Sequence, residues 1–161
     1  MMFWHGHVRW RRHCLTSDGT GRWLSLLLVF LALIFIYPLH MVFSSLFHSI
    51  SPWFPSQFIA NDTADMRTLF ICYGLSFACM AGTLLLLFRH AARRALRDGS
   101  SPFEMQKEAD LWSVPTGVGL LSVVIALLLP LSAASGWWGL PGYVYFLMAL
   151  IGPVTRRFRR R

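Results

Sequence analysis

The hydrophobic residues of this chain fall into four long blocks, which are separated by short polar stretches. The blocks occupy residues 23–47, 68–88, 111–131 and 137–155. The block at 68–88 has no charged side chain, and its 21 residues at about 1.5 Å each reach about 31 Å, the thickness of a bilayer's hydrocarbon core. The pattern therefore predicts an all-α fold, a polytopic membrane helix bundle of four transmembrane helices in one domain over residues 1–161.

The first and last blocks carry features that modify this prediction. Pro38 removes a backbone hydrogen bond within the first block, so we expect a kink there. His40 is the only His, Asp, Glu, Lys or Arg within the four blocks. It is an intramembrane polar candidate for a proton or ion contact. The simpler interpretation is a hydrated imidazole near the headgroups, because His40 lies about 26 Å along the helix from Trp23. Pro141 and Pro153 leave the limits of the fourth block least well defined.

The polar stretches predict the orientation of the chain in the membrane. Four basic residues lie in the tail 1–22, five in the loop 89–110 and five in the tail 156–161, and Arg67 is the fifteenth. Because basic residues accumulate on the cytoplasmic side, both termini and the loop 89–110 are expected in the cytoplasm.

The loop 89–110 has a pattern of its own. Its arginines at 89, 93, 94 and 97 fall on one helical face, so the second span is expected to continue as a basic helix. Gly99-Ser100 then ends it. Ser101 as N-cap, Pro102 at the first helical position and Glu104 in a capping box predict a second helix, and hence a short cytoplasmic helical hairpin. The acidic residues 104, 108 and 110 are expected to pair with the hairpin's arginines or to lie solvated.

Small residues mark two candidate helix-packing faces. Gly74, Ala78 and Gly82 recur every four residues in the second span, and Gly119 belongs to a similar face of the third. Such seams let helices approach closely in membranes. Packing within one monomer and packing in a homo-oligomer both remain open.

Composition and charge exclude several functions. Hydrophobic residues make up 55% of the chain and charged residues 14%, with a net charge of +8. The basic residues flank apolar spans instead of forming a soluble basic face, so we expect contact with anionic lipid headgroups and not with nucleic acid.

Enzymatic and metal chemistry are not predicted either. The spans hold no carboxylate, and the acidic residues outside them form no acid/base pair. His5 and His7 lack a supporting thiolate or carboxylate cluster, so no metal site and no cofactor are predicted. Asp18–Gly21 lacks the spacing of a phosphate loop and predicts a turn.

Several short stretches are similar to the bacterial relatives of the endolysosomal potassium channel, a family of small six-helix membrane proteins. These stretches are Phe3-Trp4-His5 with His7, Tyr37-Pro38-Leu39, Tyr73-Gly74-Leu75, Arg89-His90-Ala91, Gly119-Leu120-Leu121-Ser122 and Tyr145-Phe146-Leu147. The resemblance covers most of the chain and aligns it with the end of the family's second helix through its sixth. It implies a channel or channel subunit in a bacterial plasma membrane.

The family's signature is missing from this chain. That signature is an Arg followed by Phe-Ser-Asp on the first, pore-lining helix, whereas Ser17-Asp18 here lacks the preceding Phe. No pore-lining residue can therefore be assigned. Three explanations stand side by side: a shortened member, a reading frame begun late, or another family with similar hydropathy. A non-catalytic membrane scaffold or accessory subunit is the alternative function.

Overall fold

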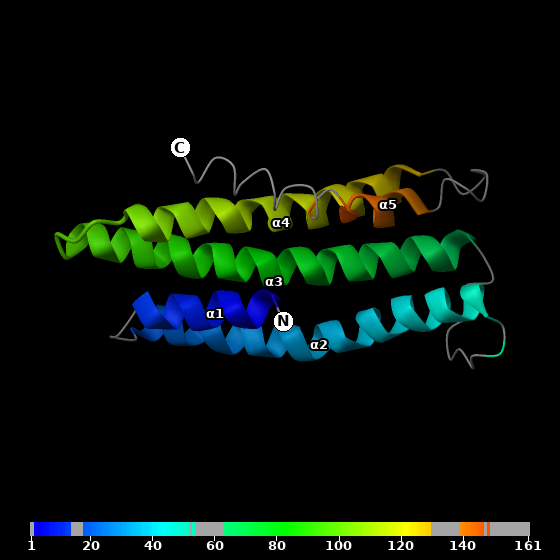
Figure 1. Ribbon diagram of the computed structural model, residues 1–161, viewed down its shortest axis with the longest axis horizontal. Helices are drawn as coiled ribbons and strands as arrows, with labels where there is room; N and C mark the ends of the chain where they lie inside the picture. Colours follow the sequence, from blue (N-terminus) through cyan, green and yellow to red (C-terminus); the bar gives the residue numbers. More distant parts are fainter. Residues whose placement is uncertain are drawn as a thin grey trace. The chain divides into compact units, whose positions relative to one another are not determined.

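The computed structural model describes residues 2–13, 18–51, 53, 63–129, 139–146 and 148. Its helices are α1 (Met2–His13), α2 (Gly19–Ile50), α3 (Thr63–Arg97), α4 (Phe103–Leu128) and the short α5 (Leu140–Tyr143) (Figure 1). Every regular element in these ranges is a helix, which confirms the all-α prediction.

Three of the helices are long and apolar enough to cross a membrane. These are Gly19–Ser44 within α2, Ala64–Arg97 within α3 and Phe103–Leu128, the whole of α4. They contain the predicted spans 23–47, 68–88 and 111–131 almost completely. Most of the fourth predicted span, 137–155, and all of the tail 156–161 lie outside the described residues.

Two local predictions need correction. The predicted span 111–131 places Pro115 in its first turn, where proline is tolerated, but α4 begins at Phe103, so Pro115 is an interior residue of the helix. Asp18–Gly21 was expected to be a turn and is instead the start of α2. The Asp18 carboxylate accepts a hydrogen bond from the Gly21 amide at 3.1 Å, which is an N-cap contact.

The junction of α3 and α4 is short, because glycine lets α3 end abruptly. Gly99 has a φ of 72°, the left-handed conformation that a side chain disfavours. The Gly99 amide donates to the Leu96 carbonyl and the Ser100 amide to the Ala95 carbonyl, the pair of bonds that defines a Schellman C-cap. In α4 the Gln106 amide donates to the Pro102 carbonyl, so this helix begins within a residue or two of its predicted start.

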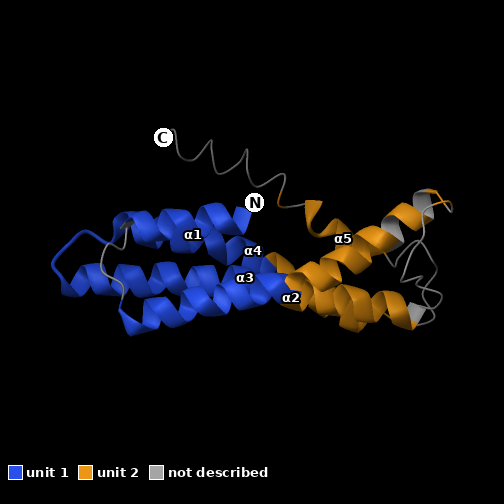
Figure 2. Cartoon of the chain, turned by 90° about the horizontal axis from the view of Figure 1, so that it is seen from below, with its two compact units in different colours: residues 1–34, 77–117 blue, residues 35–76, 118–161 orange. Residues whose placement is uncertain are grey.

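The chain divides into two compact units, each made of separate chain segments. Unit 1 comprises residues 1–34 and 77–117, and unit 2 comprises residues 35–76 and 118–161 (Figure 2). The long helices α2, α3 and α4 each contribute to both units. The prediction of one domain over residues 1–161 stays a prediction.

The core of unit 1 is the buried face of α3. Ala81, Leu84, Leu87 and Phe88 have no exposed surface, and their spacing of three or four residues places them along one side of the helix. This side faces α1, because a Cβ added at Gly6 would lie 3.1 Å from the Leu84 side chain. Helix α3 is therefore the central element of this unit.

The tail 1–22, for which no helix was predicted, contains helix α1. Phe3 packs edge-on against Phe77 of α3 at 5.4 Å between ring centroids and lies 5.7 Å from Trp112 of α4. Gly6 lies so close to Trp112 that a Cβ would come within 2.4 Å of its ring. Trp10 is buried beside Gly21 of α2. One short helix thus contacts all three long helices of unit 1.

Unit 2 is held by aromatic and neutral polar contacts. Tyr73 of α3 meets Tyr145 edge-on at 5.2 Å and lies 5.3 Å from Phe35 of α2. The fully buried Ser122 hydroxyl of α4 donates to the carbonyl of Pro141 in α5 at 2.9 Å. These contacts connect α2, α3, α4 and α5 without a carboxylate.

Candidate functional site

Gly74 is a point of close approach between α3 and α4 in unit 2. It is buried, and a Cβ built on it would lie 2.8 Å from Val123 Cγ2 and 3.2 Å from the backbone carbonyl oxygen of Gly119. A backbone atom cannot move aside as a side chain can. Two of the candidate packing residues, Gly74 and Gly119, are therefore side by side.

The other two packing candidates lie in unit 1 and have more room. Ala78 is buried with 5% of its surface exposed. A Cβ at Gly82 would lie 3.7 Å from Thr116 Cγ2, an ordinary van der Waals distance. The seam thus differs along its length, since only its Gly74 end is closed to a methyl group.

His40 lies on an exposed surface of α2, in unit 2. Nearby Pro38 is buried, so the two residues occupy different sides of the helix. A role for His40 in transport stays a prediction.

Charged groups gather instead at the end of unit 1 where α3 meets the start of α2. His90 Nε2 donates to Asp18 Oδ2 at 2.6 Å, and Arg94 Nη1 lies 3.6 Å from the same oxygen. Arg94 also lies 3.8 Å from Asp98. The hydrogen bond from His90, followed by that from the Gly21 amide, holds the pKa of Asp18 below its ordinary value. One carboxylate therefore caps α2 and connects it to α3.

A second ion pair links α1 to α4. Arg9 Nη1 donates to Glu108 Oε1 at 2.6 Å, and the Glu108 side chain is only 7% exposed. The sequence predicts that Glu108 pairs with an arginine of the α3–α4 hairpin or lies in solvent. In the structure Glu108 is instead buried and pairs with Arg9 of α1. A buried carboxylate requires such a partner, because desolvation of an unpaired charge is costly.

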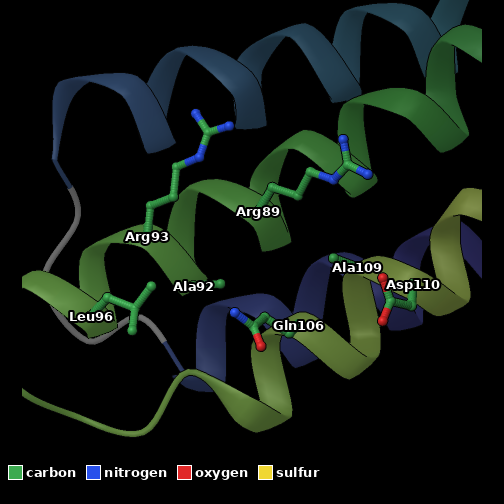
Figure 3. Close-up of a pocket in the computed structure, with 7 residues that line it drawn as sticks. All are labelled: Arg89, Ala92, Arg93, Leu96, Gln106, Ala109 and Asp110. Atoms are coloured by element: carbon green, nitrogen blue, oxygen red, sulfur yellow. The ribbon is translucent and has the colours of Figure 1, made fainter.

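A cavity of about 260 Å³ lies between α3 and α4 beyond the apolar part of α3. Its lining consists of Arg89, Ala92, Arg93, Leu96, Gln106, Ala109 and Asp110 (Figure 3). Both arginines are exposed, and among the described residues neither forms an ion pair with a carboxylate. Figure 3 shows both guanidinium groups extended away from α4, on which Gln106 and Asp110 lie one turn apart.

The histidines of α1 do not come together as metal ligands. His7 Nε2 lies 3.1 Å from the Ser25 hydroxyl of α2, and its ring stacks on Trp10 at 5.7 Å. Burial, and then the charge of Arg11, lowers the pKa of His7 below 6.5. Within the ranges that the structure describes, no three His, Cys, Asp or Glu residues are placed to hold a metal ion.

Sequence reasoning missed both the α1 helix and the Asp18 cluster. The spacing of Phe3, Gly6 and Trp10 is a helical face, and it was the available signal for α1. The cluster gave no comparable signal, because Asp18 and His90 are 72 residues apart in the chain.

Comparison with known proteins gives one informative result. No family model matches the chain, and neither does any curated protein. Among solved structures, a variant of the potassium channel MtTMEM175 crystallised with a nanobody–MBP fusion protein is similar, with a TM-score of 0.76. The match covers 97% of this chain and 72% of that chain, at 20% sequence identity.

This likeness agrees with the resemblance found in the sequence, which is thereby confirmed at the level of the fold. At 20% identity it establishes the arrangement of helices and nothing about permeation. Together with three helices of membrane-spanning length, it identifies an integral membrane protein. The chain has the fold of the bacterial channel MtTMEM175 along almost its whole length.

Proposed function

We propose that this protein is a potassium-channel-like membrane protein, acting as a channel subunit. The observation that carries the proposal is the fold shared with MtTMEM175 over 97% of the chain. Neutral apolar blocks suit this function, since residues 23–47, 68–88 and 111–131 hold no carboxylate for coupled transport, and the acidic residues outside them form no recognisable acid/base pair for catalysis.

A channel subunit has to assemble with further copies to enclose a pore. Helix α2 supports such an assembly, because large apolar side chains remain exposed on it within the monomer. These are Trp23, Leu26, Leu27, Val29, Phe30, Leu33, Ile34, Ile36, Tyr37, Phe43 and Phe47. Lipid and a second copy of the chain are both suitable neighbours for such a surface.

The orientation is part of the proposal. Both termini and the α3–α4 junction are placed in the cytoplasm of a bacterial inner membrane, with Arg67 at the opposite side. The tail 1–22, the loop 89–110 and the tail 156–161 hold fourteen of the fifteen basic residues, which places them on the cytoplasmic side in this proposal. Arg67 is the fifteenth, and its guanidinium group donates to the Leu127 carbonyl at 2.7 Å near the C-terminal end of α4. Labelling from outside intact cells tests the orientation, with single cysteines placed at Asp98 and at Ser51. We expect label on Ser51→Cys, and label on Asp98→Cys would mean that the protein has the opposite orientation.

Flux through liposomes tests the conduction itself. Purified protein is reconstituted into vesicles loaded with potassium, and efflux is measured without valinomycin. We expect efflux above that of protein-free vesicles, and none when a bulky organic cation replaces potassium. Valinomycin added at the end gives the total releasable potassium in each sample.

Efflux that appears only after valinomycin is added would contradict the channel function. The alternative, a non-catalytic scaffold or accessory subunit, would then account for the same fold and the same spans. A matched His40→Ala variant shows whether the one intramembrane histidine takes part, since unchanged flux between pH 5 and pH 8 removes it from the mechanism.

A further inference from the structure

The cavity between α3 and α4 lies where the hydrocarbon core ends in the proposed orientation. Residues 68–88 of α3 carry no charge and span about 31 Å, so Arg89 is the first charged residue at headgroup level. Arg93 follows one helical turn further out. The cavity lined by both arginines therefore lies at the depth of lipid phosphates.

The charges around the cavity select the kind of phosphate. Arg89 and Arg93 contribute two positive charges and Asp110 one negative charge, so the lining has a net charge of +1. A phosphodiester carries one negative charge and balances this lining. A phosphomonoester carries about −1.5 to −2 at neutral pH, and Asp110 would repel it.

The two arginines are free to bind an anion, whereas their neighbour is not. Arg94 is engaged by Asp18 and Asp98, but Arg89 and Arg93 form no ion pair among the described residues. Guanidinium groups bind phosphate oxygens in a planar, two-pronged geometry. Because both side chains are exposed, a change of rotamer brings them to a ligand in nanoseconds or less.

The α4 side of the cavity supplies complementary polar groups. The Gln106 amide is a donor for a phosphate oxygen, and the Asp110 carboxylate is an acceptor for a hydroxyl. A glycerol headgroup attached to a phosphodiester presents both partners. The volume of about 260 Å³ is below the roughly 300 Å³ at which sites for drug-sized ligands begin, so it suits a headgroup alone.

We propose that this cavity binds the headgroup of an anionic phospholipid, a phosphodiester bearing hydroxyls, with Arg89, Arg93 and Gln106 on the phosphate and Asp110 on a headgroup hydroxyl. The proposal rests on the membrane location proposed above but not on ion conduction. It names one site, in contrast to a general attraction of lipids to basic segments.

Native mass spectrometry of the full chain in detergent, titrated with phosphatidylglycerol, tests the site. The double variant Arg89→Gln/Arg93→Gln should weaken binding at least tenfold and leave phosphatidylcholine binding unchanged. The control Arg11→Gln/Arg12→Gln removes two exposed positive charges from α1, which line a different hollow, and should weaken binding less than threefold. Equal losses in both variants, or no loss in the first, would overturn the proposal.

Further measurements distinguish a folding defect from a loss of binding, and a lipid from a soluble phosphate ester. If the glutamine variant does not fold, Arg89→Lys/Arg93→Lys keeps the charge, and its loss of the guanidinium fork should cost threefold or more. Binding of the lysine variant equal to that of wild type would overturn the proposal. Displacement of the lipid at equal concentration by glycerophosphoglycerol, the soluble phosphodiester left when the acyl chains are removed, would overturn the lipid assignment in favour of a soluble phosphate ester.

Asp110→Asn probes the headgroup hydroxyl. Wild-type protein should prefer phosphatidylglycerol to phosphatidate, and the variant should lose that preference because phosphatidate then binds more tightly. An unchanged preference would remove Asp110 from the site as proposed. Selective lipid binding without potassium flux would leave the site standing and contradict the channel function, so the two failures are distinguishable.

Discussion

In unit 1 ion pairs join the helices at their ends, whereas in the described part of unit 2 the contacts are made by aromatic rings, a buried hydroxyl, two facing glycines and the hydrogen bond from Arg67 to a backbone carbonyl. Asp18, His90 and Glu108 all lie in unit 1. Tyr73, Tyr145 and Gly74 lie in unit 2. The same three long helices supply both units, so the difference comes from sequence position along each helix.

In the proposed membrane orientation, the difference follows from the solvent around each part of the helices. Charged side chains are costly within a hydrocarbon core and far less costly at headgroup level. Neutral contacts between small and aromatic residues are the usual means of joining helices within lipid. The variants below test this contrast, beginning with the largest expected effect.

The apolar core of unit 1 should be the most sensitive part. Leu87→Ala removes a side chain with no exposed surface and should lower the free energy of unfolding by about 2–5 kcal/mol, because a cavity remains. Its neighbour Leu86 is 53% exposed, and Leu86→Ala should cost much less. Unfolding by sodium dodecyl sulphate in mixed micelles, followed by circular dichroism, measures both; equal losses would mean that α3 is not the central helix of unit 1.

The ion pair of unit 1 should come next. Glu108→Gln keeps the shape of the side chain but removes the charge that Arg9 contacts, and should cost about 1.5–3 kcal/mol. Glu104 lies exposed one turn earlier on α4, so Glu104→Gln should cost less than about 0.5 kcal/mol. The same micelle titration compares them. Indistinguishable midpoints would show that the Arg9 contact does not stabilise α1 on α4.

The seam of small residues should respond differently in the two units. Gly74→Ala places a methyl group against the Gly119 carbonyl and should destabilise unit 2 by about 1–3 kcal/mol. Gly82→Ala meets only Thr116 at an ordinary distance, so better helix propensity should leave stability equal or raise it by up to about 1 kcal/mol. Thermal unfolding in detergent separates them. Opposite signs are expected, and equal losses would place an unseen neighbour, such as a second copy, against Gly82.

Local pattern explains what could be predicted of this fold. The uncharged length of 68–88 and the apolar blocks at 23–47 and 111–131 specify helices without reference to the rest of the chain. Gly99-Ser100 likewise specified the end of α3 by local backbone geometry. Such features depend on neighbours a few residues away, so one sequence is sufficient to find them.

The contacts that shape the candidate site depend on distant residues instead. Arg9 and Glu108 are 99 residues apart, and the hairpin's arginines at 89, 93, 94 and 97 are much nearer to that carboxylate in the sequence. The helical spacing of Phe3, Gly6 and Trp10 indicates the helix α1 itself, but its place beside α4 depends on Gly6 fitting against Trp112, which no local pattern reveals. The cavity between Arg89 and Gln106 arises only once the short Schellman turn sets α3 beside α4.

The smallest expected effect concerns pH and again separates the two units, because His7 belongs to unit 1. Burial against Trp10 and Ser25 and the charge of Arg11 lower its pKa below 6.5, so the folded protein binds fewer protons here than the unfolded chain. Stability from this residue is complete above pH 6.5 and decreases as the pH falls towards the lowered pKa. The unfolding midpoint of the wild-type protein should fall between pH 8 and pH 5, and that of His7→Gln should fall less. His5→Gln, at an exposed position of α1, should show the same fall as wild type. If both variants retained the full decline, protonation elsewhere would control it, and the packing of α1 would not be the pH-sensitive contact of unit 1.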